Sequence, residues 1–455
     1  MAEGEAPKSE TTKAVRSTEA AKKINKIMKD FYARAQAASQ EGRPVAWCMA
    51  GIPPEILNAM HVESVFPENF GTVSAATQTA VPFIEKAEGD AFSVDICSYA
   101  RIGLGFAARL AELGGKSPPE AARGGMAYPS MFICPSLACD PRYKWFHAFK
   151  RYLPDVPLHV YDYMTPSDDV DVRDPHVAQH YIEHNLDQLR SLVAFMEKVT
   201  GARLDKKALA YALDKAQEAE HYYYEANQLR KAVPSPMPSQ DFFALIAPSM
   251  YMRGTQEVVD FFRDLRDEVK DRVEKGIGVI PVEKYRLLWG GIPMWFNMGI
   301  FNYFESLGAV FAIETTYGHG YETHIEVDEK DPVKSLAEWT YWTMVETNSE
   351  GPEAECGTRQ ADRFMEYIRD YAIDGVVMHT TRSCRAVSIG QQHTRNVLKN
   401  YLQVPSMLVE TDMGDARTYS DAQVKMRINA FMETLEAVKE GVSLEDAEAA
   451  AGAGS

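Results

Sequence analysis

Short apolar runs alternate with longer stretches of helical spacing along most of the chain. The runs are bounded by glycine, proline or polar residues, as is typical of strands buried on both faces. They lie at Pro44–Ala50, Val62–Phe66, Ser130–Cys134, Leu158–Tyr161, Leu287–Trp289, Ala309–Ile313, Val376–His379 and Ser406–Glu410. This alternation predicts the α/β class, with mostly parallel sheets covered by helices on both faces.

The stretches between these runs carry apolar residues at helical spacing. We expect helices at Ser17–Ala38, Pro54–Met60, Thr72–Lys86, Cys97–Leu113, Arg142–Tyr152, Val177–Thr200, Asp205–Lys231, Gln256–Lys275, Met294–Leu307, Pro332–Val345, Thr358–Tyr371, Ile389–Tyr401 and Ser420–Lys439. The polar residues 1–16 and the Ala/Gly-rich tail after the last helix are expected to lack regular structure.

Two parts of the chain repeat one pattern. Gly51-Ile-Pro and Gly290-Gly-Ile-Pro each come directly after an apolar run. Cys139 and Cys384 lie 245 positions apart, the same offset as between two matching valines. Such a repeat predicts two lobes of one topology. We therefore divide the chain into an N-terminal tail and helix (1–42), a first α/β lobe (43–165), a helical region (166–279) and a second α/β lobe (280–445).

Composition excludes some classes of function. The 455 residues are 45% hydrophobic and 25% charged, which is ordinary for a globular protein of two or three domains. The net charge of −17 argues against a nucleic-acid partner. No apolar run approaches the roughly 20 residues that span a bilayer. Because the N-terminus lacks an apolar signal core, we expect a cytoplasmic protein.

The segment Gly375–Ser388 carries the first candidate chemistry. A short strand leads into a polar turn in which Cys384 lies between Arg382 and Arg385. Nearby positive charge favours a thiolate, so a lowered pKa is expected for this cysteine. Thiolates act as nucleophiles and metal ligands. The alternative is a cysteine in an ordinary polar turn.

The other cysteines gain meaning from the repeat. Cys139 and Cys384 each follow the third strand of a lobe by five residues, and Cys97 begins a helix, where free N–H groups favour an anion. Without a fourth partner, these cysteines make a poor structural zinc site, but they suit a cluster or metal with one open position. Cys48 is expected in the core, and Cys134 either in the core or as a rival ligand. Cys356, in an acidic loop, is expected to be an exposed thiol.

Several stretches carry a resemblance to a known family. They are Gly51–Met60, Asp95–Arg101, Cys139–Lys144, Gly375–Arg385 and Glu410–Arg417, together with Tyr419, Ser420 and Arg427. With these stretches the chain resembles the subunits of 2-hydroxyacyl-CoA dehydratases and class I benzoyl-CoA reductases, over nearly its whole length. The resemblance implies two Rossmann-like lobes facing a cleft. It also implies a [4Fe-4S] cluster held by Cys97, Cys139 and Cys384, with one iron open to water or substrate.

The resemblance leaves two reactions open. Both begin with a low-potential electron delivered to an acyl-CoA; dehydratases then expel a 2-hydroxyl group, whereas benzoyl-CoA reductases reduce the aromatic ring to a cyclic diene. The Trp/Phe/Met-rich segment Trp289–Phe304 is similar to the larger catalytic subunit of the reductase and would suit a pocket for a flat ring. Alternatively, these aromatic residues pack the core of the second lobe. The expected function is therefore a benzoyl-CoA reductase subunit, with a dehydratase subunit as the alternative.

The chain carries no Gly-x-x-x-x-Gly-Lys-Ser/Thr loop for ATP phosphates. The resemblance assigns ATP hydrolysis to separate activator subunits that feed electrons to a heterodimer of two cluster-bearing paralogues, of which this chain would be one. Two other functions stay open besides a catalytic subunit. The chain could be a partner subunit that only relays electrons, or a protein that delivers clusters to other proteins.

The remaining candidates are proton donors and cations. Glu55 begins the helix after the first strand, and His379 ends the strand before Cys384, so either could donate a proton near the cluster. Glu55 could equally cap its helix, and His379 could be a satisfied core histidine. Arg101, Arg382 and Arg385 would stabilise the anionic cluster or CoA phosphates, or would pair with local carboxylates.

Overall fold

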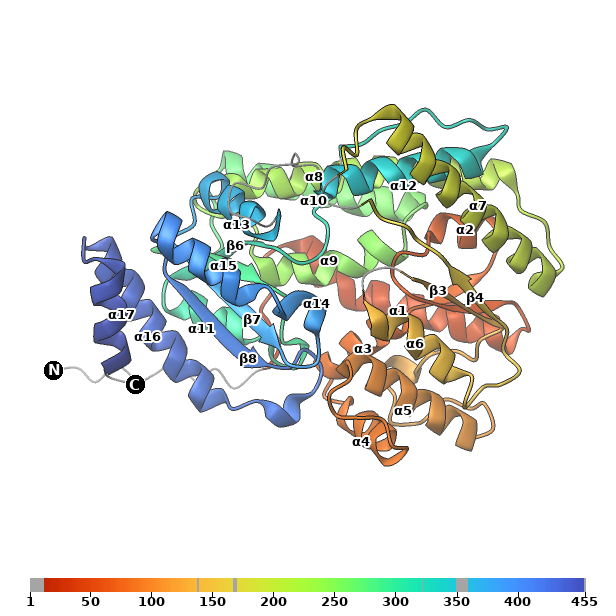
Figure 1. The fold of residues 1–455 in the computed structure, drawn as a ribbon, viewed down its shortest axis with the longest axis horizontal. Helices are drawn as coiled ribbons and strands as arrows, with labels where there is room; N and C mark the ends of the chain where they lie inside the picture. The colour runs from red at the N-terminus through yellow and green to blue at the C-terminus, as the bar shows by residue number, and fades with distance from the viewer. Residues whose placement is uncertain (1–11, 137–138, 167–169, 321, 349–358, 454–455) are drawn as a thin grey trace.

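Two four-stranded parallel sheets form the frame of the computed structural model, which describes residues 12–136, 139–166, 170–320, 322–348 and 359–453 (Figure 1). The strands are β1 (Val45–Cys48), β2 (Glu63–Val65), β3 (Met131–Pro135), β4 (Leu158–Tyr161), β5 (Tyr285–Gly290), β6 (Ala309–Glu314), β7 (Gly375–Thr381) and β8 (Ser406–Thr411). The strand orders β2-β1-β3-β4 and β6-β5-β7-β8 are the same, so the prediction of two lobes with one topology is confirmed.

The central strands are continuous apolar runs because helices cover both faces of each sheet. Every residue of β1, β3, β5 and β6 is buried. In each sheet the first strand along the chain, β1 or β5, lies between the next two strands. The strand order therefore reverses its direction at β1 and at β5. In open parallel sheets, ligands bind outside the carboxyl ends of strands at such a switch point. A ligand site is therefore expected at the loops after β1, β3, β5 and β7.

The helices of the first lobe are α2 (Pro54–Ala59), α3 (Pro67–Ala76), α4 (Val81–Gly89), α5 (Ser98–Glu112) and α6 (Asp140–Phe149). The prediction of a single helix over Thr72–Lys86 is wrong, because α3 and α4 occupy this stretch as two separate helices. The chain leaves α3 through Gln78, whose φ of 61° is left-handed, and Pro82 lies in the first turn of α4. Proline suits a helix start but cannot donate to the preceding turn, so the two helices stay separate.

The second lobe carries η3 (Trp295–Asn297), α11 (Ile300–Ser306), α13 (Arg359–Asp370), α14 (Arg385–Ser388), α15 (Gln391–Val397), η4 (Leu398–Leu402), α16 (Asp421–Lys439) and α17 (Leu444–Ala453). The helix expected at Ile389–Tyr401 instead starts directly after Cys384 and is interrupted at Gly390. The C-terminal tail is also not irregular. It forms α17, which packs on α16 and buries Leu444 and Ala447.

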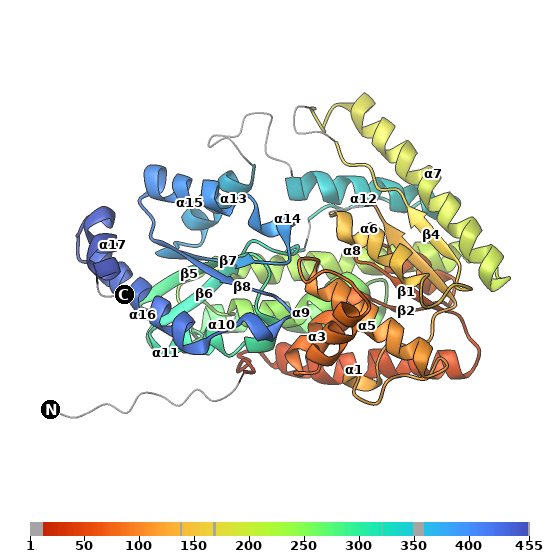
Figure 2. The same ribbon diagram turned by 60° about the horizontal axis from the view of Figure 1, so that its bottom comes forward.

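A helical layer joins the lobes. It consists of α1 (Glu19–Gln40), α7 (Pro175–Thr200), α8 (Lys206–Gln228), η2 (Leu229–Lys231), α9 (Ser239–Tyr251), α10 (Gln256–Glu274) and α12 (Pro332–Asn348). Helix α9 lies between the two lobes (Figure 2), where Phe243 packs against Trp295. Sequence patterning missed it because it is buried nearly all round and therefore has no polar face.

The residues just before α1 are held against the second lobe. Gly299 donates its N–H to the carbonyl of Thr12, and the N–H of Val15 donates to Asn302 Oδ1 at 2.8 Å. The buried carboxylate of Asp241 accepts the N–H groups of Ser17 and Thr18. Residues 12–16 form no helix or strand, as expected, but these hydrogen bonds hold them against the fold; residues 1–11 lie outside the described residues.

A buried ion pair fixes the helical layer to the second sheet. Arg230 in η2 and Glu314 at the end of β6 are fully buried, and two guanidinium nitrogens contact the two carboxylate oxygens at 2.7 and 2.8 Å. His319 Nε2 lies 2.7 Å from the same carboxylate. Burial alone would raise the pKa of Glu314, but Arg230 and His319 outweigh it and lower the pKa to about 2.

Within the described residues, no helix combines the length and the apolar character that a membrane span requires.

Candidate functional site

A cavity of about 360 Å³ lies where the two lobes meet, beyond the carboxyl ends of β3 and β7. Cys97, Cys139 and Cys384 all line it, so the structure brings together the cysteines selected from the sequence. Two of them belong to the first lobe and one to the second. Ser383, which precedes Cys384, lines the cavity as well.

Each of these cysteines is the N-cap residue of a helix. Cys97 caps α5, Cys139 caps α6, and Cys384 caps α14. The first turn of a helix has backbone N–H groups without partners inside the helix, and these groups favour negative charge. Three such turns around one cavity make a place suited to an anionic, thiolate-bound group.

Burial raises the pKa of all three thiols, and backbone N–H groups of the following helical turn partly oppose it. The expected lowering of the Cys384 pKa by its two arginines is therefore wrong. Arg382 Nε pairs with Glu410 at 2.9 Å, and Arg385 pairs with Asp140 across the lobes, also at 2.9 Å. Both guanidinium groups are mostly exposed and compensated by carboxylates, so they do little for the thiol.

The donor set is of the kind that iron-sulfur clusters take. Such clusters are held by cysteine thiolates, and three thiols line this cavity, each at the start of a helix. Among the described residues, no group of three or more His, Cys, Asp or Glu side chains is arranged to hold a metal ion.

The rest of the cavity wall is mainly apolar. Leu104 of α5 and Trp145 of α6 are buried there, and Phe92 and Ile96 are half-buried. Gly103 allows this arrangement, because a Cβ atom at that position would lie 2.4 Å from the Trp145 ring. The charged lining residues Asp95, Asp140, Lys144 and Arg385 are exposed and mark the mouth. The three thiols are therefore half-buried behind a mainly apolar wall.

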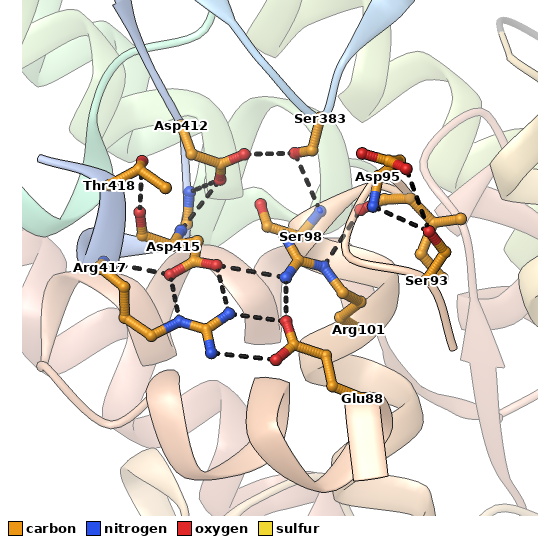
Figure 3. Close-up of polar contacts among 12 residues, drawn as sticks. Glu88, Ser93, Asp95, Ser98, Arg101, Ser383, Asp412, Asp415, Arg417 and Thr418 are labelled. Atoms are coloured by element: carbon orange, nitrogen blue, oxygen red, sulfur yellow. Dashed lines mark hydrogen bonds and ion pairs between the residues drawn. The ribbon is translucent and has the colours of Figure 1, made fainter. Parts of the chain in front are cut away.

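A hydrogen-bonded bridge connects the lobes beside the thiols (Figure 3). The N–H of Ser98, next to Cys97, donates to Ser383 Oγ at 3.1 Å. The hydroxyl of Ser383, next to Cys384, donates to Asp412 in the loop after β8. All three residues are buried. This bridge sets the separation between the two cysteines that come from different lobes.

Arg101 supports the same junction from below, as Figure 3 shows. Its guanidinium contacts Glu88 at 2.5 Å and Asp415 of the second lobe at 3.2 Å, and its Nε donates to the carbonyl of Ile96. Arg417 pairs with the same two carboxylates. Arg101 does not line the cavity. Its contacts match the alternative in which this arginine pairs with local carboxylates. A role toward a bound anion stays a prediction.

Sequence reasoning gave no role to Arg142 and Glu68, which lie beside Cys139. Arg142 Nε and a terminal nitrogen contact the two carboxylate oxygens of Glu68 at 3.0 and 2.9 Å, and the guanidinium also donates to the carbonyl of Ala50. The pair connects α6 to α3 and to the turn after β1. Arg142 belongs to a stretch that carries the family resemblance, which is the one signal that pointed to it.

Glu55 lies away from the cavity lining. It is fully buried in α2, and its Oε1 accepts from Arg253 Nε at 3.0 Å. Arg253 also contacts Glu220 of α8, so this carboxylate connects helices rather than facing the thiols. The role of proton donor stays a prediction, and the contact of Glu55 is an ion pair between helices rather than the helix cap that was the alternative.

Glu220→Gln should change how stability depends on pH. Burial raises the pKa of Glu220 to about 7, above its ordinary value of 4.5, so the folded state disfavours the ionised carboxylate. In the wild type, the contribution of protonated Glu220 to the free energy of unfolding is present at pH 4.5 and is lost as pH rises through 7. We expect the variant to gain about 1–3 kcal/mol relative to wild type between pH 4.5 and 8. Urea unfolding at both pH values measures it, and a pH-independent difference would contradict it.

His379 is also away from the cavity lining. It is fully buried beneath the turn that follows β5, where its Nδ1 contacts the carbonyl of Ile292. Burial lowers its pKa to about 4, so the imidazole is neutral near pH 7. Its assignment as a proton donor likewise stays a prediction. Its contacts match the alternative of a core histidine.

The segment Trp289–Phe304 does not line the cysteine cavity. Trp289, Phe301 and Phe304 pack in the second lobe, as the alternative expected. Trp295 instead reaches the first lobe, where its Nε1 donates to the hydroxyl of Tyr99. Other residues of the segment line a separate cavity of about 250 Å³ beside α16.

The other cysteines lie apart from the cavity. Cys48 and Cys134 are fully buried in β1 and β3, and burial raises the pKa of both thiols. Their expected place in the core is confirmed, and Cys134 does not line the cavity as a rival ligand. Cys356 lies outside the described residues.

The sequence is similar to known proteins over nearly its whole length. Residues 49–435 match the family model described as 2-hydroxyglutaryl-CoA dehydratase, D-component. The chain is 27% identical to the (R)-2-hydroxyisocaproyl-CoA dehydratase alpha subunit of Clostridioides difficile, with 91% of this chain and 95% of the relative covered. It is 25% identical to the (R)-phenyllactyl-CoA dehydratase alpha subunit of Clostridium sporogenes, with 95% and 99% covered.

A relative of the other reaction type is similar to the same extent. The chain is 25% identical to a subunit of the benzoyl-CoA reductase of Thauera aromatica, with 91% of this chain and 94% of the relative covered. Identity therefore does not separate the two reactions. The matched region includes all three cysteines of the cavity.

Proposed function

Because this chain belongs to the family of 2-hydroxyglutaryl-CoA dehydratase D-components, we propose that it is an iron-sulfur subunit of an ATP-dependent benzoyl-CoA reductase. The observation that carries the proposal is the gathering of Cys97, Cys139 and Cys384 on one cavity, each capping a helix. These thiols would hold a [4Fe-4S] cluster with one iron free of protein ligands. When bound, the cluster supplies single electrons of very low potential.

The residues around the thiols define what else the site does. Leu104, Trp145 and Phe92 exclude water, which protects a strongly reducing centre from side reactions. The same apolar wall suits the flat, uncharged ring of an aromatic acyl-CoA. The exposed cations Lys144 and Arg385 at the mouth would meet the phosphate groups of CoA. The product of ring reduction would be a cyclic dienoyl-CoA.

A 2-hydroxyacyl-CoA dehydratase is the second candidate. The family description and the alpha subunits of C. difficile and C. sporogenes favour it. This reaction needs polar groups near the thiols for a departing hydroxide. Among the described cavity residues, those groups are Ser383 and the charged residues of the mouth.

The proposal includes partner proteins. The similar dehydratase chains are named as alpha subunits, and the similar reductase chain is also named as one subunit of its enzyme, so each has at least one companion. We infer a paralogous cluster-bearing subunit for this chain and an ATP-hydrolysing activator as the electron donor. A subunit that only relays electrons would hold the cluster without turning over substrate.

The test is product analysis under anaerobic conditions. The chain is purified with its paralogous subunit and activator and incubated with reductant, ATP and either benzoyl-CoA or a 2-hydroxyacyl-CoA. We expect a cyclic diene from benzoyl-CoA that depends on ATP. Water loss from the 2-hydroxyacyl-CoA, with no diene, would replace the reductase by the dehydratase.

A further inference from the structure

Asp412 lies immediately behind the thiols of both lobes. It follows β8 and is 2% exposed. Ser383 connects it to Cys384 by sequence and to the start of α5, where Cys97 lies, by the hydrogen bond from Ser98 (Figure 3). Buried hydrogen bonds therefore join this carboxylate to the segments that carry both cysteines.

Asp412 is the acceptor of three hydrogen bonds. Its Oδ1 accepts the N–H groups of Gly414 and Asp415 at 2.8 and 2.9 Å, and Oδ2 accepts the Ser383 hydroxyl. These bonds fix the position of the carboxylate.

No arginine, lysine or histidine within the described part of the chain forms an ion pair with this carboxylate. The neighbouring Asp415 and Glu88, in contrast, share Arg101 and Arg417. The negative charge of Asp412 therefore remains uncompensated beside the cavity.

We propose that Asp412 is a positioning residue that lowers the reduction potential of the group held by Cys97 and Cys384. This inference rests on the proposed function, because it requires a cluster at the thiols. A fixed negative charge in a buried, poorly polarisable setting opposes the addition of an electron. Net charge, hydrogen bonds and exposure are the protein's main means of setting a cluster potential. Ser383 holds the charge in place and keeps the lobes at their working separation.

The test is a redox titration of the cluster, followed by EPR, in Asp412→Asn. Asparagine keeps the side-chain oxygen that accepts from Gly414 and Asp415, and its amide group can donate to Ser383, so the turn is retained while the charge is removed. We expect the midpoint potential to become less negative, with iron content unchanged. The matched control is Asp30→Asn, which removes the same charge from an exposed position on α1. The control should leave the potential unchanged.

Ser383→Ala provides an independent arm if the asparagine variant does not fold. It removes a donor to the carboxylate and leaves the charge, so the potential should stay equal or become more negative. A less negative potential in Ser383→Ala, or an unchanged one in iron-replete Asp412→Asn, would overturn the inference while leaving the proposed function intact. A wild-type protein that binds no iron would instead overturn the proposed function, and this inference with it.

Discussion

Cys384→Ala is expected to abolish the iron-sulfur cluster of anaerobically isolated protein. The cavity offers three thiols from two lobes, and removal of the one from the second lobe leaves the cluster attached on one side only. Metal binding of this kind depends on the complete ligand set. Cys97→Ala and Cys139→Ala should have the same effect. Iron and sulfide analysis, with the visible absorption of the cluster, measures the loss.

Cys48→Ala is the matched control for this experiment. Its thiol is fully buried in β1 and does not line the cavity, so the variant should keep its iron. Full iron retention in Cys384→Ala would remove that residue from the ligand set. Loss of iron in Cys48→Ala would show that folding, not ligation, controls the iron content.

Arg230→Met is expected to destabilise the protein by about 3–5 kcal/mol. The substitution leaves the fully buried carboxylate of Glu314 without its main counter-charge, and breaking a buried pair in this way is much more costly than its net contribution suggests. Chemical unfolding, monitored by circular dichroism, measures the change. The loss should shrink as pH falls from about 4.5 to 2, because the pKa of Glu314 is about 2 in the folded wild type and 4.5 when unfolded, so the wild type itself loses stability in that range.

The adjacent residue provides the control. Lys231 pairs with Asp370 at 2.6 Å, but the two side chains are 39% and 50% exposed. Exposed pairs contribute about 0–1 kcal/mol, so Lys231→Met should change stability little. Equal losses in the two variants would show that the buried pair has no special role at the junction of η2 and β6.

The sheets were predictable from the sequence because their signal is local. Strands buried on both faces are unbroken apolar runs, as in β1, β3, β5 and β6. The half-buried edge strand β4 was also placed at the residues that the structure shows. The repeat of Cys139 and Cys384 then gave the common strand order. Helix α9 and the break at Gln78 were not predictable in this way. Helix α9 has no polar face to mark it as a helix, and the break at Gln78 depends on how the chain turns between α3 and α4.

The candidate site was predictable only in part. Cys139 and Cys384 follow strand ends, and Cys97 begins a helix, so their placement near one edge of the sheets was predictable. The effect of Arg382 and Arg385 on Cys384 was not, because Glu410 and Asp140, which compensate them, are distant in sequence or across the lobes. The same holds for the burial of His379 and for the bridge from Ser98 to Asp412. Charge effects depend on three-dimensional partners that spacing does not reveal.

The division of the cavity between two lobes has a consequence for biosynthesis. Cys97 and Cys139 leave the ribosome long before Cys384, which follows Cys139 by 245 residues. The first lobe folds around its own sheet, yet on its own it presents only part of the ligand set. Under the proposed function, iron would therefore be loaded only after translation has passed the second sheet and the Ser98–Ser383 contact has closed. A nascent chain stalled before that point would carry two unprotected thiols, exposed to oxidation.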